Sequence, residues 1–141
     1  MVQLLTGTKG TGKTKRLIAK ANAAVEATKG YVAVVAIGLD LRYDISAQAR
    51  LINVKEYYVE GEEMLLGFLG GICAGNYDVT DIFVDTTLKI LGTKDPEMIK
   101  GFIRKVEKLS QVTNTNFVLS VSIEQSEIAD VADDFIRMTE D

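Results

Sequence analysis

The stretch that most constrains how this chain can fold is a glycine-rich segment close to its first residue. Residues 7–14 read Gly-Thr-Lys-Gly-Thr-Gly-Lys-Thr and match the spacing G-x-x-x-x-G-K-[ST]. Glycines at these positions let the backbone turn tightly, so that the N–H groups of the loop and of the following helix can surround an anion. The spacing therefore predicts a strand, a phosphate-binding loop and a helix, in that order.

The residues on both sides of the loop agree with this prediction. Residues 2–6 are short and mostly apolar, as in a strand. Residues 12–29 are expected to form the helix, because their apolar members repeat at helical spacing. Gly30 is expected to end this helix as the residue that follows its C-cap.

Each position of the motif has an expected task. The backbone N–H groups of residues 9–14 would hold the phosphates, and Lys13 would reach the β- and γ-phosphates of a nucleotide. The hydroxyl of Thr14 would bind Mg²⁺. The predicted nucleotide-binding residues are Gly7, Thr8, Lys9, Gly10, Thr11, Gly12, Lys13, Thr14 and Lys15.

The rest of the chain alternates between buried strands and amphipathic helices. Further strands are expected at 31–37, 51–54, 80–85, 116–122 and 135–138, and helices at 60–75, 95–113 and 124–134. This alternation predicts right-handed βαβ units. The expected fold is a three-layer α/β/α sandwich with a mostly parallel sheet of about five strands, formed by residues 1–141 as a single domain.

A carboxylate follows the apolar run Ile82-Phe83-Val84. Asp85 would lie at the carboxyl end of a parallel strand, which is the edge where ligands bind in open α/β sheets. We therefore predict that Asp85 holds Mg²⁺ together with Thr14. Asp81 is an alternative metal ligand, but it would stand at the other end of the strand. A second alternative is that Asp85 only caps a turn and binds no metal.

On these two segments the chain resembles the P-loop nucleoside triphosphatases. The order of its strands is similar to the RecA-like branch, in which an extra strand lies between the loop strand and the strand that ends in the acidic residue. The resemblance implies the P-loop fold, ATP or a related nucleotide as the ligand, and Mg²⁺ as the metal. It also implies that Lys13 and Asp85 are the catalytic residues.

The chain departs from that family at the next position. Hydrolysing members of this branch carry Glu directly after the acidic residue, where it orients the attacking water, whereas this chain has Thr86. The first hypothesis is therefore an ATP hydrolase that is slow or needs activation by a partner. The second is a nucleotide-sensing binding module with little turnover.

Adenine is favoured over guanine as the base of the nucleotide. Guanine-specific GTPases carry the motif [NT]-K-x-D, and residues 93–96 miss it by one position.

Two further resemblances bear on the function. Residues 4–7, 10–14, 52–54 and 107–110 are similar to small bacterial ATP-binding proteins of unknown role that are sometimes labelled twitching-motility PilT-like. The motif Asp40-x-Arg42-Tyr43 is similar to one in type II thymidine kinases, which makes a small-molecule or nucleoside kinase the third hypothesis. Those kinases also carry the missing Glu and a cysteine-bound zinc, whereas Cys73 is the only cysteine here.

Composition excludes several other classes of function. The formal net charge is −4, which disfavours nucleic acid binding through a broad basic surface. The absence of histidine excludes histidine general-base chemistry and histidine–cysteine zinc sites. A membrane span is not expected, since no apolar run approaches about 18 residues. The lone cysteine and the strand that begins at residue 2 suggest a cytoplasmic protein.

A few remaining residues are candidates for supporting roles. Ser120 or Ser122, near the end of a strand, could contact the γ-phosphate. Gly67, Gly71 and Gly75 repeat on one helix face and predict close packing within the chain, or alternatively against a partner. An arginine could stabilise charge during hydrolysis, and one supplied by a neighbour would require a protein partner or a homo-oligomer. The candidates are Arg42, Arg50, Arg104 and Arg137.

Overall fold

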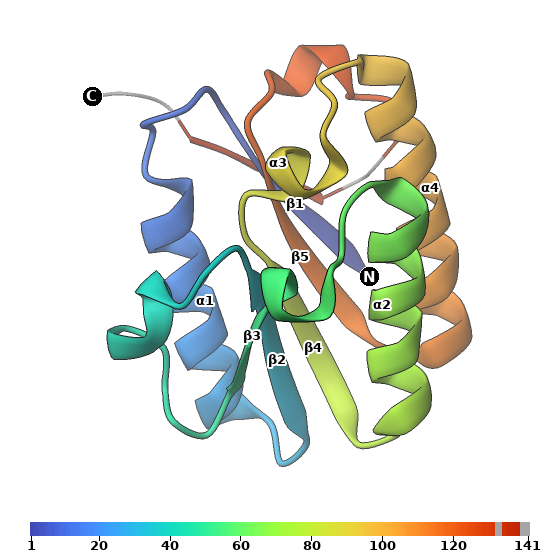
Figure 1. Ribbon diagram of the computed structural model, residues 1–141. Coiled ribbons are helices and arrows are strands. Elements are labelled where there is room, and N and C mark those ends of the chain that lie inside the picture. Colours follow the sequence, from blue (N-terminus) through green and yellow to red (C-terminus); the bar gives the residue numbers. More distant parts are fainter. Residues whose placement is uncertain (132–133, 139–141) are drawn as a thin grey trace.

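Six parallel strands form one sheet through the centre of the protein (Figure 1). The computed structural model describes residues 1–131 and 134–138. The strands are β1 (Val2–Thr6), β2 (Tyr31–Ala36), β3 (Arg50–Asn53), β4 (Val79–Val84), β5 (Asn116–Val121) and β6 (Asp134–Arg137). Their order across the sheet is β3-β2-β4-β5-β1-β6, and each neighbouring pair is parallel.

Helices cover both faces of this sheet. They are α1 (Lys13–Ala27), α2 (Glu62–Gly75), α3 (Thr87–Leu91) and α4 (Pro96–Thr113), with 3₁₀ turns η1 (Asp40–Tyr43), η2 (Val54–Tyr57) and η3 (Gln125–Glu127). In Figure 1, α1 lies on one side of the sheet and α2 and α4 lie on the other. The predicted α/β fold with three layers is confirmed.

Successive residues of the strands feed two separate cores. Leu4 packs with side chains of α2 and α4, whereas its neighbour Leu5 packs with side chains of α1. In β4, Ile82 and Phe83 divide between the two cores in the same way. A strand buried on both faces needs apolar residues at every position, which explains the continuous apolar runs in the sequence.

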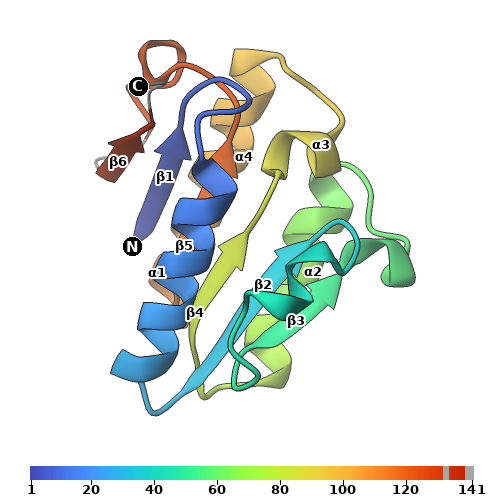
Figure 2. The ribbon, with the colours of Figure 1, turned by 90° about the vertical axis from the view of Figure 1, so that its left-hand side faces the viewer.

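The strand order brings distant parts of the chain to one edge of the sheet. β5 lies between β1 and β4, and all strands point the same way (Figure 2). The glycine-rich loop after β1, Asp85 after β4 and Ser122 after β5 therefore follow the carboxyl ends of adjacent strands. This edge is where ligands bind in folds of this class.

The helix predicted at 95–113 is α4, and its first residues favour a helix start. The carboxylate of Asp95 accepts a hydrogen bond from the backbone N–H of Glu97 at 3.2 Å, and Pro96 is the first helical residue. Proline fits this position because its missing N–H would have no partner within the helix.

The predicted mostly parallel sheet of about five strands has six strands, all of them parallel. Three details of the prediction are wrong. Within the described residues the expected helix at 124–134 is only the turn η3, and residues 132 and 133 lie outside the described ranges. The short helix α3 was not expected. Gly30 does not cap α1, which ends at Thr28 in extended conformation.

Gly30 is instead required by close packing between chain segments. A Cβ at this position would overlap the carbonyl oxygen of Asp78 and would lie 2.5 Å from the methyl carbon of Thr80. The glycine thus lets the start of β2 pass the start of β4. Along the described residues, no helix is long and apolar enough to cross a membrane.

Candidate functional site

The loop between β1 and α1 takes the conformation that its glycines predict. Gly7 and Gly12 have φ angles of 132° and 89°, which L-residues with a side chain rarely adopt. A Cβ at Gly7 would also overlap the carbonyl oxygen of Met138. Residues 7–12 therefore form a tight turn that leads directly into α1.

The first turn of α1 lies next to the loop, and its backbone N–H groups carry partial positive charge that no acidic residue of that turn neutralises. Gly12 is the N-cap, so this helix end has no capping side chain from the described residues, and its first turn contains no acidic residue. The first N–H groups of a helix have no partners within it and carry partial positive charge. Lys13, Thr14 and Lys15 occupy this turn, and Lys15 is exposed there.

Lys13 is folded back into the glycine-rich loop. Its ammonium group donates to the carbonyl oxygens of Gly7 at 3.0 Å and Thr8 at 2.7 Å, and it lies 3.4 Å from the hydroxyl oxygen of Thr11. Only 6% of the residue is exposed. Burial lowers the pKa of Lys13, and the nearby carboxylate of Asp85 acts in the opposite direction. The ammonium thus exchanges water for backbone oxygens of its own loop.

Asp85 links the end of β4 to the start of α1 through hydroxyl groups. The hydroxyl of Thr14 donates to one carboxylate oxygen and that of Thr86 donates to the other, each at 3.0 Å. Asp85 is 7% exposed. The structure thus brings together Thr14 and Asp85, the two residues that the sequence predicted as metal ligands, although 71 positions separate them.

The backbone is strained directly after Asp85. Thr86 has a φ angle of 53°, in the left-handed region. This conformation costs about 1–2 kcal/mol for a residue with a Cβ, and branching at that carbon makes it less common still. The unusual turn directs the chain from β4 into α3, beside the loop.

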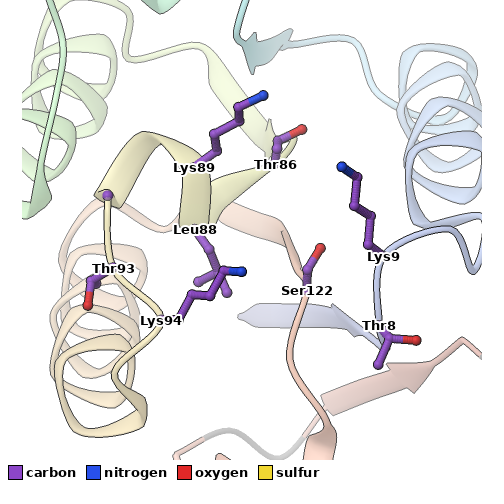
Figure 3. A pocket seen from close by; sticks show the side chains of 9 residues that line it. Thr8, Lys9, Thr86, Leu88, Lys89, Thr93, Lys94 and Ser122 are labelled. Atoms are coloured by element: carbon purple, nitrogen blue, oxygen red, sulfur yellow. The ribbon is translucent and has the colours of Figure 1, made fainter.

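A cavity of about 650 Å³ opens between the glycine-rich loop and the segment that follows β4 (Figure 3). Of the predicted nucleotide-binding residues, Thr8 and Lys9 line it. Ser122, at the end of β5, also lines it, as expected for one of the two serines. Ser120 is buried within the strand instead.

The predicted arginines lie away from this cavity, as far as their side chains are described. Arg42 stacks on the ring of Tyr43 and donates to the carbonyl oxygen of Leu39. Arg104 pairs with Asp130. The cavity-lining residues of the described ranges include neither of these two arginines nor Arg50. The side chain of Arg137 lies outside the described part of the chain.

No sequence motif indicated the opposite wall of the cavity. Lys89 and Lys94 bring positive charge to this wall, which is formed by Thr86, Leu88, Lys89, Gly92, Thr93 and Lys94. Thr93 and Lys94 were considered only as part of a near-match to the guanine motif, whereas Asp95 was expected at the start of a helix and caps α4. The available signal was position in the chain, because any segment that follows the strand ending at Asp85 must begin at this edge of the sheet.

The sequence matches no protein-family model, and no curated protein matches it either. The function therefore has to be inferred from the geometry of the site.

Proposed function

We propose that this protein binds ATP together with Mg²⁺ and hydrolyses it slowly or only when a partner activates it. The observation that carries the proposal is the hydrogen bond between Thr14 and Asp85, which lies beside a loop that holds Lys13. A hydroxyl, a carboxylate and an ammonium group that converge at the start of a helix match the needs of a metal-bound triphosphate.

The loop has the donors that phosphate groups require. The first turn of α1 offers backbone N–H groups, and the chain adds no negative charge there. Phosphate oxygens would replace the carbonyl oxygens of Gly7 and Thr8 as partners of Lys13. A nucleotide would thereby give the ammonium group charged oxygen partners in place of neutral ones, and such hydrogen bonds are stronger.

The residues present also fit a magnesium ion. Mg²⁺ prefers oxygen ligands, and it is often bound through one or two protein side chains, with phosphates and water completing the shell. The oxygens of Thr14 and Asp85 are 3.0 Å apart and supply two such groups. When bound, the ion would neutralise charge on the phosphates.

The proposal of slow turnover rests on what surrounds the expected position of the γ-phosphate. Thr86 follows Asp85, and a hydroxyl does not act as a general base at neutral pH. None of the described residues that line the adjacent cavity is a carboxylate. This composition also favours the second candidate, a nucleotide-sensing module that binds and releases ATP with little turnover.

Topology supports the resemblance to the RecA-like branch of the P-loop proteins. That branch places a strand between the loop strand and the acidic strand, and here β5 lies between β1 and β4. The kinase hypothesis has less support, because Asp40, Arg42 and Tyr43 are not among the described residues that line the cavity.

Thermal melting with and without Mg²⁺, in the presence of ATP, ADP, GTP or AMP, tests the proposal. We expect ATP with Mg²⁺ to raise the melting temperature, and phosphate release measured in the same samples to be slow. Lys13→Ala should abolish the shift, while circular dichroism of the apo protein stays that of wild type. Lys108→Ala, which removes an exposed lysine of α4, is the matched control.

The outcomes separate the candidates clearly. A melting shift with slow phosphate release supports the hydrolase, and a shift without release supports the sensing module. If Lys13→Ala keeps the full shift, the loop is not the phosphate site and the proposal is wrong.

A further inference from the structure

The cavity beside the loop carries a charge opposite to that of the whole molecule. The chain has a formal net charge of −4, yet Lys9, Lys89 and Lys94 all line this cavity. In Figure 3, Lys9 and Lys94 stand on opposite sides of the open space, and Lys89 stands beside Thr86. A local reversal of charge around a cavity favours an anionic ligand.

The three lysines have no competing acidic partners among the residues that the structure describes. The ion pairs of those residues involve Lys100, Arg104 and Lys105, whereas Lys9, Lys89 and Lys94 form none. Ammonium groups around one space repel one another. An anion between them would relieve this repulsion, so the arrangement is suited to a ligand with more than one negative charge.

The helix α3, which carries Lys89, is firmly held. Leu88, Ile90 and Leu91 of α3 are buried in the core. The carbonyl oxygen of Ile90 accepts a hydrogen bond from the backbone N–H of Gly61 at 2.9 Å. Lys89 of the same helix is exposed and lines the cavity.

We propose that this cavity binds a small phosphate ester that also carries hydroxyl groups, next to the phosphates of the nucleotide. Its volume of about 650 Å³ lies within the range of small-molecule sites. Ammonium groups of Lys89 and Lys94 would bind the phosphate dianion, and the hydroxyls of Thr86 and Ser122 would bind those of the ligand. The inference rests on the proposed function only for the nucleotide beside the cavity.

The inference is tested with a double variant and two probes. Glycerol 3-phosphate and glucose 6-phosphate are titrated by calorimetry into the chain of 141 residues, both alone and with saturating ADP and Mg²⁺. Glycerol and glucose serve as uncharged controls. We expect at least one ester to bind under both conditions, and neither uncharged compound to bind.

Lys89→Ala/Lys94→Ala should weaken that binding by about tenfold or more, because two charged contacts to phosphate are lost. The same variant should keep the thermal shift caused by ADP and Mg²⁺. Lys108→Ala should match wild type in both measurements. Lys13→Ala should lose the nucleotide shift and keep the affinity for the ester, which separates this inference from the proposed function.

Three results would overturn the inference. One is that neither ester binds to the wild-type protein. Another is that the double variant binds the ester as tightly as wild type does. The third is that ADP displaces the ester, or that the double variant also loses nucleotide binding, because the lysines would then belong to the nucleotide site itself. If nucleotides fail to bind at all while the ester binding depends on Lys89 and Lys94, only the proposed function fails.

Discussion

At the scale of single residues, Asp85 is the organising group of the site. Its two carboxylate oxygens accept hydrogen bonds from Thr14, at the start of α1, and from Thr86, directly after β4. A buried carboxylate is costly unless its oxygens are hydrogen-bonded, and here both are. Asp85 therefore fixes the distance between the start of α1 and the end of β4.

Asp85→Asn should weaken the dependence of the ATP-induced melting shift on Mg²⁺. The amide keeps the size of the side chain and one acceptor oxygen, but it loses the charge that binds a divalent cation. The measurement is the melting temperature with ATP across a magnesium titration. Asp81→Asn, at the amino end of the same strand, is the control and should leave the titration unchanged.

An unchanged titration for Asp85→Asn would show that Asp85 has only a structural role. A changed titration for Asp81→Asn with an unchanged one for Asp85→Asn would make Asp81, the alternative considered from the sequence, the residue that binds the metal.

At the scale of elements, the glycines of α2 and the glycine before β2 have opposite roles. Gly67, Gly71 and Gly75 were expected to allow close packing within the chain, yet a Cβ at any of them would meet no described atom within 4 Å. All three are exposed, so the prediction of intramolecular packing is wrong. Gly30, expected to be only a helix end, is the position where packing demands glycine.

Gly67→Ala should raise the free energy of unfolding by about 1 kcal/mol, because alanine is the better helix former and has room there. Gly30→Ala should lower it by about 1–3 kcal/mol, because the new methyl group would overlap the backbone of residue 78. Urea denaturation of both variants tests the pair. A loss of stability in Gly67→Ala would indicate that this face of α2 packs against a partner, and an unchanged Gly30→Ala would contradict the close contact.

At the scale of the whole molecule, ion pairs connect α4 to the segment that follows η3. Asp130 lies 3.2 Å from the ammonium of Lys100 and 3.5 Å from the guanidinium of Arg104. Beneath them, Ile128 is fully buried in the core. The hydrogen bond from Lys100 lowers the pKa of Asp130, and the same bond raises the pKa of Lys100.

The ion pairs of Asp130 with Lys100 and Arg104 should make the stability of the fold depend on pH. The folded state holds the pKa of Asp130 below its unfolded value, so its contribution is present above the unfolded value and is lost as pH falls through the folded one. The contribution of Lys100 is lost at the other end, as pH rises through its raised pKa. Asp130 and Arg104 are exposed, so added salt should weaken both effects.

Asp130→Asn should therefore lose less stability than wild type does as the pH falls through the acidic range. The measurement is the urea midpoint of wild type and variant across the acidic range at low salt, and Glu127→Gln, an exposed carboxylate nearby in sequence, is the control. If the urea midpoint falls equally with pH in wild type and Asp130→Asn, the ion pairs of Asp130 do not contribute to the pH dependence of stability.

Local patterns allowed much of the fold and half of the site to be predicted. Apolar runs located the strands, and Asp95 with Pro96 marked the start of α4, because such signals act between residues close in sequence. The spacing of residues 7–14 predicted the turn into α1 in the same way. Asp85 was found because a strand that ends in a carboxylate is also a local pattern.

The tertiary structure decided what lies next to what. Strand order places β5 between β1 and β4 and brings Gly30 close to residue 78. It also places Lys9, Lys89 and Lys94 around one cavity. The five-residue helix α3 is too short to show a period, and the segment after β5 formed a turn where a helix was expected. The sequence by itself thus determined the elements and the loop, since these follow from neighbouring residues. The charged cavity needed the tertiary structure, because its walls are far apart in the chain and meet only when the sheet is assembled.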